Sequence, residues 1–300
     1  MCDVYMRILI LGGSGMLGHK LWLTCAGRFE TYATVRSALA FPKSKFFDES
    51  RMLTGVSVEE FDTVAKAFEL IRPEVVVNCI GIVKQDAAAN DPIRSIAVNS
   101  LFPHRLAQLC GANKSRLIHL STDCVFSGRD GNYSEVDATD ADDLYGRTKA
   151  LGEVDYDDCL TIRTSMIGRE LAGSHGLIEW FLGQQGKTVR GFKRALFSGL
   201  TTNALADVIA AIIAHQPQLR GTWHLAADAI NKFDLLSQVR DQFELDIKIE
   251  PDETFICDRT LNGERFRNAT GITAPSWPDM IAGMRADPLP YDELRRLNAN

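Results

Sequence analysis

The stretch RILILGGSGMLGHKLWL, residues 7–23, passes from an apolar run through a glycine turn into an amphipathic run. This order predicts a buried strand, a tight turn and a helix. Glycines at the turn let the chain bend sharply, let the backbone approach a pyrophosphate, and let the helix pack close to the strand. The N–H groups at the start of the helix favour phosphate. The stretch predicts a dinucleotide site, with the pyrophosphate against Gly12, Ser14, Gly15, Met16, Leu17 and Gly18.

Apolar strands and amphipathic helices alternate along the first half of the chain. Strands are expected at 7–11, 30–37, 74–81, 116–122 and 159–168, and helices at 56–73, 93–111 and 143–156. This alternation predicts an α/β, Rossmann-type doubly wound parallel sheet. We expect a dinucleotide-binding domain at 1–168 and a smaller mixed α/β substrate-binding lobe at 169–300. In the second part, 184–201 reads as a loop, 203–215 as a helix and 221–228 as a short strand, and residues near 200–226 are expected to return to the first domain.

Composition limits the partners. The 300 residues carry a formal net charge of −6 and no block of clustered Lys and Arg, which argues against a nucleic-acid partner. Seven cysteines are scattered without C-x-x-C spacing, as in a reduced protein without a zinc site. We expect no signal peptide, and no apolar stretch of the sequence is long enough to span a bilayer. We expect a soluble, cytoplasmic protein that has no metal and no membrane contact.

A residue at the end of the second predicted strand bears on the cofactor. Enzymes that use NAD commonly place an acid there for the ribose 2′-hydroxyl, whereas an Arg accommodates the 2′-phosphate of NADP. Here Arg36 stands at that place, with no acid beside it. NADPH is the expected cofactor, with NADH as the alternative, and an exposed salt-bridging Arg is the simpler interpretation of the residue itself.

Tyr145 and Lys149 are four residues apart, hence on one face of the predicted helix. A nearby ammonium favours the phenolate, which is expected to lower the pKa of Tyr145 and suit it to general acid/base work. The strand-end hydroxyls of Ser121 and Thr122 could assist at a substrate carbonyl, or could simply bond backbone groups.

The cluster STDCVFSG, residues 121–128, admits three interpretations. Cys124 as a nucleophile has no identifiable base partner, and a free Cys is more often a small buried hydrophobe. Asp123 as a metal ligand has no other ligand spaced to join it. Proton handling beside a cofactor is the hypothesis that remains.

The motifs GGSGMLG, NCIG, VNS, STDCVFSG, YGRTKALGE and IRTSMIG, in this order, resemble the extended short-chain dehydrogenase/reductases, and more narrowly the dTDP-4-dehydrorhamnose reductase family. The resemblance implies hydride transfer from NADPH to C4 of a 4-keto-6-deoxyhexose carried on a nucleoside diphosphate, in deoxysugar synthesis for surface polysaccharide. It implies a catalytic triad of Thr122, Tyr145 and Lys149. The same resemblance places Asn78, Cys79, Gly81 and Asn99 at the cofactor, and Val83, Asp123, Cys124, Phe126 and Arg259 at the substrate. It also allows a homodimer.

Two other functions stay open. Dehydratases of the superfamily read T-D-E at the strand end, and Cys124 stands where their Glu would handle the eliminated water, so a dehydratase or epimerase is less favoured. The resemblance extends to a binding module without catalysis, the regulatory β subunit of methionine adenosyltransferase. Departures such as Gly263 in DRTLNGERF, where the family has Ser, lie in regions that face the substrate and leave the nucleoside and the sugar open.

Overall fold

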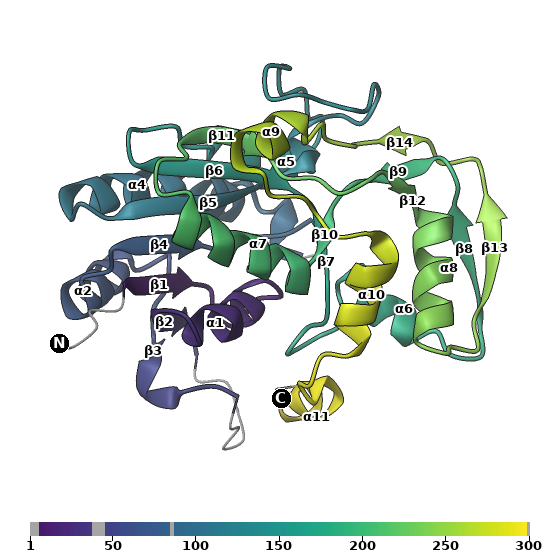
Figure 1. The fold of residues 1–300 in the computed structure, drawn as a ribbon, viewed down its shortest axis with the longest axis horizontal. Helices are drawn as coiled ribbons and strands as arrows, with labels where there is room; N and C mark the ends of the chain where they lie inside the picture. The colour runs from purple at the N-terminus through teal and green to yellow at the C-terminus, as the bar shows by residue number, and fades with distance from the viewer. Residues whose placement is uncertain (1–5, 38–45, 85–86, 299–300) are drawn as a thin grey trace.

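In a computed structural model of the chain, which describes residues 6–37, 46–84 and 87–298, the opening stretch forms a strand, a turn and a helix as predicted. The strand pairs in parallel with a neighbour on each side, so its side chains are buried on both faces of a sheet. Seven parallel strands make up this sheet in the order β11-β6-β5-β4-β1-β2-β3, which Figure 1 shows from top to bottom. They are β1 (Arg7–Leu11), β2 (Glu30–Val35), β3 (Met52–Thr54), β4 (Val75–Asn78), β5 (Arg116–Thr122), β6 (Cys159–Thr164) and β11 (Gly221–His224).

Helices cover both faces of the large sheet, which confirms the doubly wound α/β class. Alternate residues of β1 separate the two faces. Ile8 and Ile10 pack in one apolar cluster with α1 (Gly18–Ala26) and α7 (Thr202–His215), whereas Leu9 and Leu11 pack in another with α2 (Phe61–Ile71) and α4 (Phe102–Ala112). The helices are α1 (Gly18–Ala26), α2 (Phe61–Ile71), α3 (Pro92–Ser95), α4 (Phe102–Ala112), α5 (Leu144–Leu151), α6 (Leu177–Leu182), α7 (Thr202–His215), α8 (Lys232–Gln242), α9 (Glu264–Thr270), α10 (Trp277–Arg285) and α11 (Tyr291–Leu297). No helix among the described residues is long and apolar enough to cross a membrane.

Smaller sheets lie beside the large one, at the right of Figure 1. The pairs are β13 with β8, β10 with β7, and β9 with β12 and β14 on either side. Their bounds are β7 (Met166–Ile167), β8 (Thr188–Phe192), β9 (Ala195–Phe197), β10 (Leu200–Thr201), β12 (Ile230–Asn231), β13 (Lys248–Asp252) and β14 (Cys257–Asp258).

Two local predictions are wrong, and one predicted helix contains an irregular turn. The expected loop at 184–201 contains β8, β9 and β10, because its short strands find partners far along the chain rather than nearby. A short strand, β3, was not predicted, so β5 is the fifth strand in chain order and not the fourth. The expected helix at 93–111 is divided into α3, a π-helical segment η3 (Ile96–Leu101) and α4.

Candidate functional site

A cavity of about 630 Å³ opens at the carboxyl ends of the central strands, where ligands bind in open α/β sheets. One wall follows β1, β4, β5 and α5, and the other is made of residues beyond β6. The first wall contains the predicted site residues Ser14, Gly15, Met16, Leu17, Asn78, Cys79, Gly81, Val83, Thr122, Asp123, Cys124, Tyr145 and Lys149, and Arg259 joins them from the second.

Five predicted residues lie outside this lining. Gly12 and Gly18, at the two ends of the glycine loop, do not line the cavity, and Arg36 is exposed just after β2. Phe126 is fully buried, and its carbonyl oxygen accepts a hydrogen bond from Arg259 Nε at 2.9 Å. Asn99 is also buried, behind the loop that follows β4.

The glycine loop has the geometry of a phosphate cradle. Gly12 has a φ of 85°, which side chains rarely tolerate, and a Cβ on Gly18 would lie 2.0 Å from the Gly12 carbonyl oxygen. The loop therefore closes onto the start of α1 without any side chain between them. Ser14, Gly15, Met16 and Leu17 are left facing the cavity ahead of the helix, so these residues fit the pyrophosphate of a dinucleotide.

Asn99 holds the loop after β4 in place. Its side-chain oxygen accepts from Ile82 N at 2.9 Å, and its amide donates to Ile82 O at 3.0 Å. Asn99 lies in η3, and π-helical turns often occur at functional sites. On the other side of η3, a Cβ on Gly152 would lie 1.8 Å from the Asn99 carbonyl oxygen, so α5 packs directly against this backbone. The positions of the loop and of α5 are thus tied together.

Thr122, Tyr145 and Lys149 meet on the first wall of the cavity. The Thr122 hydroxyl accepts from Cys124 N at 3.1 Å and donates to Asp123 Oδ1 at 3.1 Å. Asp143 caps the start of α5 by accepting from Gly146 N at 2.8 Å, which fixes Tyr145 in the first turn. Lys149 Nζ donates to Leu120 O at 2.6 Å, across from the end of β5.

Burial controls both titratable groups of the pair. It raises the pKa of Tyr145 above its usual value, and Cys124 adds to this, while a hydrogen bond with the Thr122 side chain acts in the opposite direction. The expectation that Tyr145 has a lowered pKa is therefore wrong for this structure, because desolvation is the largest influence on the phenol. Burial also lowers the pKa of Lys149 to about 8, although Glu153 and Cys79 act to raise it. Tyr145 is kept as a protonated phenol, the form that donates a proton.

Cys124 is unsuited to the role of a nucleophile, and Asp123 to that of a metal ligand. Burial raises the pKa of the Cys124 thiol to about 12, so the nucleophilic thiolate is scarce at neutral pH. Asp123 is buried, and burial raises its pKa as well. Within the described part of the chain, no group of three or more His, Cys, Asp or Glu side chains could hold a metal ion.

A basic residue that the sequence did not single out lines the second wall. Lys232, the first residue of α8, has its Nζ 3.8 Å from the centre of the Phe197 ring. Burial lowers the pKa of Lys232 to about 8, and Asp123 is the largest influence that raises it. Among the described residues, no carboxylate lies within ion-pair distance of this ammonium. Nothing in the local pattern AINKFD marks Lys232, because α8 reaches the cavity only through the tertiary fold.

A buried ion pair supports the first wall from behind. Glu153, the last residue of YGRTKALGE, accepts from Ser121 Oγ at 2.6 Å and pairs with Arg163 at 2.7 Å. Both side chains are close to fully buried. Each charge is compensated because the other lies beside it. This contact ties the end of α5 to β5 and β6.

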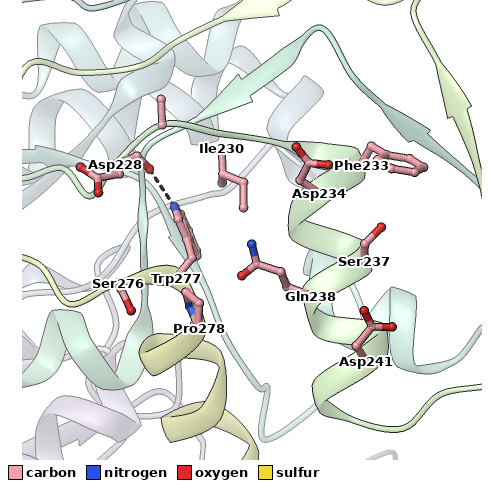
Figure 2. Close-up of a pocket in the computed structure, with 11 residues that line it drawn as sticks. Asp228, Ile230, Phe233, Asp234, Ser237, Gln238, Asp241, Ser276, Trp277 and Pro278 are labelled. Atoms are coloured by element: carbon pink, nitrogen blue, oxygen red, sulfur yellow. Dashed lines mark hydrogen bonds between the residues drawn. The ribbon is translucent and has the colours of Figure 1, made fainter.

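A second, shallower pocket lies between α8 and α10 (Figure 2). Trp277 stands in its wall and donates from Nε1 to Asp228 O at 2.7 Å. None of the predicted site residues lines it, so it is separate from the cavity described above.

Comparison with known proteins gives a consistent result. The family model described as "RmlD substrate binding domain" matches residues 6–277. A dTDP-4-dehydrorhamnose reductase from Mycolicibacterium smegmatis is 32% identical over 56% of this chain, and the matched part spans 48% of that protein, about half its length. A dTDP-4-dehydrorhamnose reductase from Salmonella typhimurium is 27% identical over 91% of this chain and 94% of its own.

Solved structures share the fold. The dTDP-4-dehydrorhamnose reductase of Bacillus anthracis, in complex with NADP, superposes with a TM-score of 0.78 over 95% of this chain and 99% of its own, at 19% identity. The UDP-glucose 4-epimerase of Thermus thermophilus, in complex with NAD, gives 0.76 over 96% and 99%, at 16% identity. At this identity the two structures support the fold alone.

Proposed function

The chain belongs to the family of the RmlD substrate binding domain, the dTDP-4-dehydrorhamnose reductase-like branch of the extended short-chain dehydrogenase/reductases, and we propose that it is an NADPH-dependent reductase of a nucleoside-diphosphate-linked 4-keto-6-deoxyhexose. The observation that carries the proposal is the position of Thr122, Tyr145 and Lys149 on one wall of a cavity that also contains the glycine loop. Relatives that carry the name of a reductase favour this function over a dehydratase, an epimerase or a binding module.

The proposed reaction is a reduction at C4 of the sugar. NADPH, when bound, supplies the hydride that the carbonyl carbon accepts. The Tyr145 phenol donates its proton to the carbonyl oxygen and regains one from solvent, so a ketone becomes a hydroxyl. Thr122 hydrogen-bonds the same oxygen as negative charge develops on it. Lys149 orients the ribose of the cofactor and holds a positive charge close to Tyr145.

The cofactor assignment uses the remaining predicted residues. Ser14, Gly15, Met16 and Leu17 would bind the pyrophosphate, with Gly12 and Gly18 shaping the turn behind them. Arg36, exposed just after β2, would contact the 2′-phosphate, which favours NADPH and leaves NADH as the alternative. Asn78, Cys79 and Gly81 would line the cofactor, with Asn99 fixing their loop.

The substrate would lie toward the second wall. Val83, Asp123 and Cys124 border Tyr145 in the cavity, and Phe126 would act through the carbonyl that anchors Arg259. Arg259 and Lys232 are the cations on this side, and a nucleoside diphosphate is the anion they suit. The residues 169–300 would form the substrate lobe, while 1–168 and the returning segment near 200–226 would form the dinucleotide domain.

Two further features belong to the same proposal. The six described cysteines are all free, as suits a reducing compartment, so we place the enzyme in the cytoplasm. A homodimer is the proposed assembly, since closed two-fold dimers are the commonest oligomers.

The direct test mixes purified protein with NADPH and a panel of nucleotide-linked 4-keto-6-deoxysugars, and follows the absorbance of the reduced nicotinamide. We expect oxidation of NADPH with at least one substrate and a product reduced at C4. Tyr145→Phe should reduce kcat by about 10²- to 10⁴-fold, the usual contribution of a general acid. Tight NADPH binding without turnover of any sugar would indicate a binding module instead, and inversion or loss of water without net oxidation of NADPH would indicate an epimerase or a dehydratase.

A further inference from the structure

The C-terminal segment of the chain contacts the back of the glycine loop through buried polar groups. This segment comprises α11 and the turn before it, the yellow end of the chain in Figure 1, and it lies beyond the region that the family model matches. Tyr291, the first residue of α11, is buried, and its hydroxyl lies 3.1 Å from His19 Nε2. His19 is the residue that directly follows the last glycine of the loop.

His19 links Tyr291 to a residue that lines the cavity. Its Nδ1 lies 2.8 Å from the carbonyl oxygen of Gly15, a glycine that lines the cavity. Because a carbonyl oxygen only accepts, Nδ1 must carry a proton, and burial lowers the pKa of His19 to about 4, so Nε2 is an acceptor at neutral pH. The Tyr291 hydroxyl therefore lies between two acceptors, His19 Nε2 and Asp287 Oδ2, the latter at 3.0 Å, and its single proton is donated to one of them at a time.

Asp287 holds the Tyr291 hydroxyl and is itself held by two other side chains. Its side chain is almost fully buried and receives Lys20 Nζ at 2.6 Å and Asn203 Nδ2 at 2.9 Å. Lys20 belongs to α1, and Asn203 to α7. The turn before α11 is thus anchored to the two helices that pack on one face of the large sheet, directly behind the glycine loop.

The same helix also reaches the second wall of the cavity. Arg169 lies over the Tyr291 ring, 4.7 Å from its centre, and donates to Glu179 at 2.6 Å. Glu179 accepts from Glu170 N at 3.1 Å and pairs with Arg295 of α11. Glu170 lines the cavity and accepts from the backbone of Gly176, another lining residue, at 2.5 Å. Tyr291 therefore stands between groups that hold opposite walls of the cofactor cleft.

We infer that the C-terminal segment Asp287–Leu297 positions the glycine loop for the dinucleotide, with Tyr291 and Asp287 as positioning residues that act through His19. The inference rests on the proposed function, because it concerns the affinity for the cofactor. Without the Tyr291 hydroxyl, His19 loses the contact that holds its ring against Gly15 O, and the loop is no longer held in one arrangement before the cofactor binds. The dissociation constant for NADPH then rises, because binding must order the loop.

The experiment compares Tyr291→Phe with Tyr156→Phe. The control removes a hydroxyl from a similar pair whose members do not line the cavity, where Tyr156 OH lies 2.9 Å from His104 Nδ1 and the rings also meet edge to face. NADPH binding is measured by fluorescence titration, and thermal unfolding is measured on the same samples. We expect the dissociation constant to rise about tenfold in Tyr291→Phe and to stay unchanged in Tyr156→Phe, with kcat at saturating NADPH preserved in both.

A second variant, a chain that ends after Pro290, lacks α11 altogether, and a rise of its dissociation constant at least as large would support the inference. If wild type binds NADPH and Tyr291→Phe binds it equally well, the inference is wrong and the proposed function stands, even if the melting temperature falls. Failure of wild type to bind NADPH would refute both.

Discussion

At the scale of single residues, burial shifts the pKa values of Tyr145 and Lys149 in opposite directions, and both shifts favour the neutral form of the side chain. The pKa of Tyr145 is raised and that of Lys149 is lowered to about 8, so each neutral form is favoured. Tyr145 stays protonated across the neutral range. The ammonium of Lys149, by contrast, is present only below about pH 8.

The first prediction concerns this pH dependence. We expect kcat to fall as pH rises through about 8, because the charge of Lys149 beside Tyr145 is lost there. Stability should change in the other direction: between pH 8 and the usual lysine value the unfolded chain binds more protons at this site, so its contribution to the free energy of unfolding rises with pH. Steady-state rates and chemical denaturation across pH 6.5–10 would test both trends. A flat rate up to pH 10 would contradict the assignment.

The second prediction concerns Lys232, a desolvated ammonium without an ion-pair partner among the described residues. Lys232→Met should raise KM for the nucleotide sugar about tenfold or more, through loss of a charged contact with the substrate. It should also raise the free energy of unfolding by about 1–2 kcal/mol, because a partly buried and desolvated charge is removed.

Lys193→Met is the control for this substitution. Lys193 also lies over an aromatic ring, that of Phe233 at 5.5 Å, but is exposed and away from the cavity lining. Its replacement should leave both KM and stability nearly unchanged. A Lys232→Met enzyme that is less stable and has an unchanged KM would show that Lys232 is structural.

At the scale of elements, the contact between α5 and η3 decides where Tyr145 and Lys149 lie. Gly152 permits that contact, since a Cβ there would meet the Asn99 carbonyl. The sequence identified Gly152 only as part of a motif, without its reason. The reason depends on the π-helical turn, which adds a residue to the helix and cannot be seen in a periodic pattern that continues on both sides of it.

The third prediction follows from this contact. Gly152→Ala should lower the free energy of unfolding by about 3 kcal/mol or more and displace α5, so that kcat falls as well. Gly283→Ala in α10, where a Cβ meets no atom within 4 Å, should instead stabilise the protein by about 0.5–1 kcal/mol. Urea denaturation and turnover of both variants would test this, and equal stabilities would contradict the packing argument.

The element-scale errors share one cause. The residues of β8 and β9 read as a loop because neither strand is buried throughout and each pairs with a segment more than thirty residues away, β13, β12 or β14. Every residue of β4 and β5 is buried, and the apolar runs VVV and LI within them mark both strands in the sequence. Short strands depend on tertiary partners that no local pattern reveals.

At the scale of the whole molecule, the charge of the cavity differs in sign from that of the chain. Four basic side chains and two acidic ones line it among the described residues, whereas the chain carries a net charge of −6. The glycine loop and the Tyr–Lys pair were predictable because each is a local pattern. Lys84 and Lys232 were not, since they reach the cavity through the arrangement of distant segments.

The fourth prediction concerns the stability of the whole chain. The cleft is made of segments from residue 14 to residue 259, so a bound dinucleotide should stabilise the entire fold. At about 100 times its dissociation constant, NADPH should raise the free energy of unfolding by about 2.7 kcal/mol. Differential scanning calorimetry should show an increase in the melting temperature on the order of 5 °C. An unchanged melting temperature at that concentration would argue against binding to the native state.

β11 is synthesised long after the strand with which it pairs, and this affects folding of the chain during translation. β11 pairs with β6, yet it is made more than fifty residues after it. While the ribosome is still translating residues 165–220, β6 is an edge strand with unpaired N–H and C=O groups and apolar side chains, the kind of edge that recruits other strands. A nascent chain stopped before β11 should therefore aggregate or engage chaperones, and a chain extended past it should not. The rate of translation across this interval thus becomes a determinant of yield, even though no residue within it belongs to the catalytic triad.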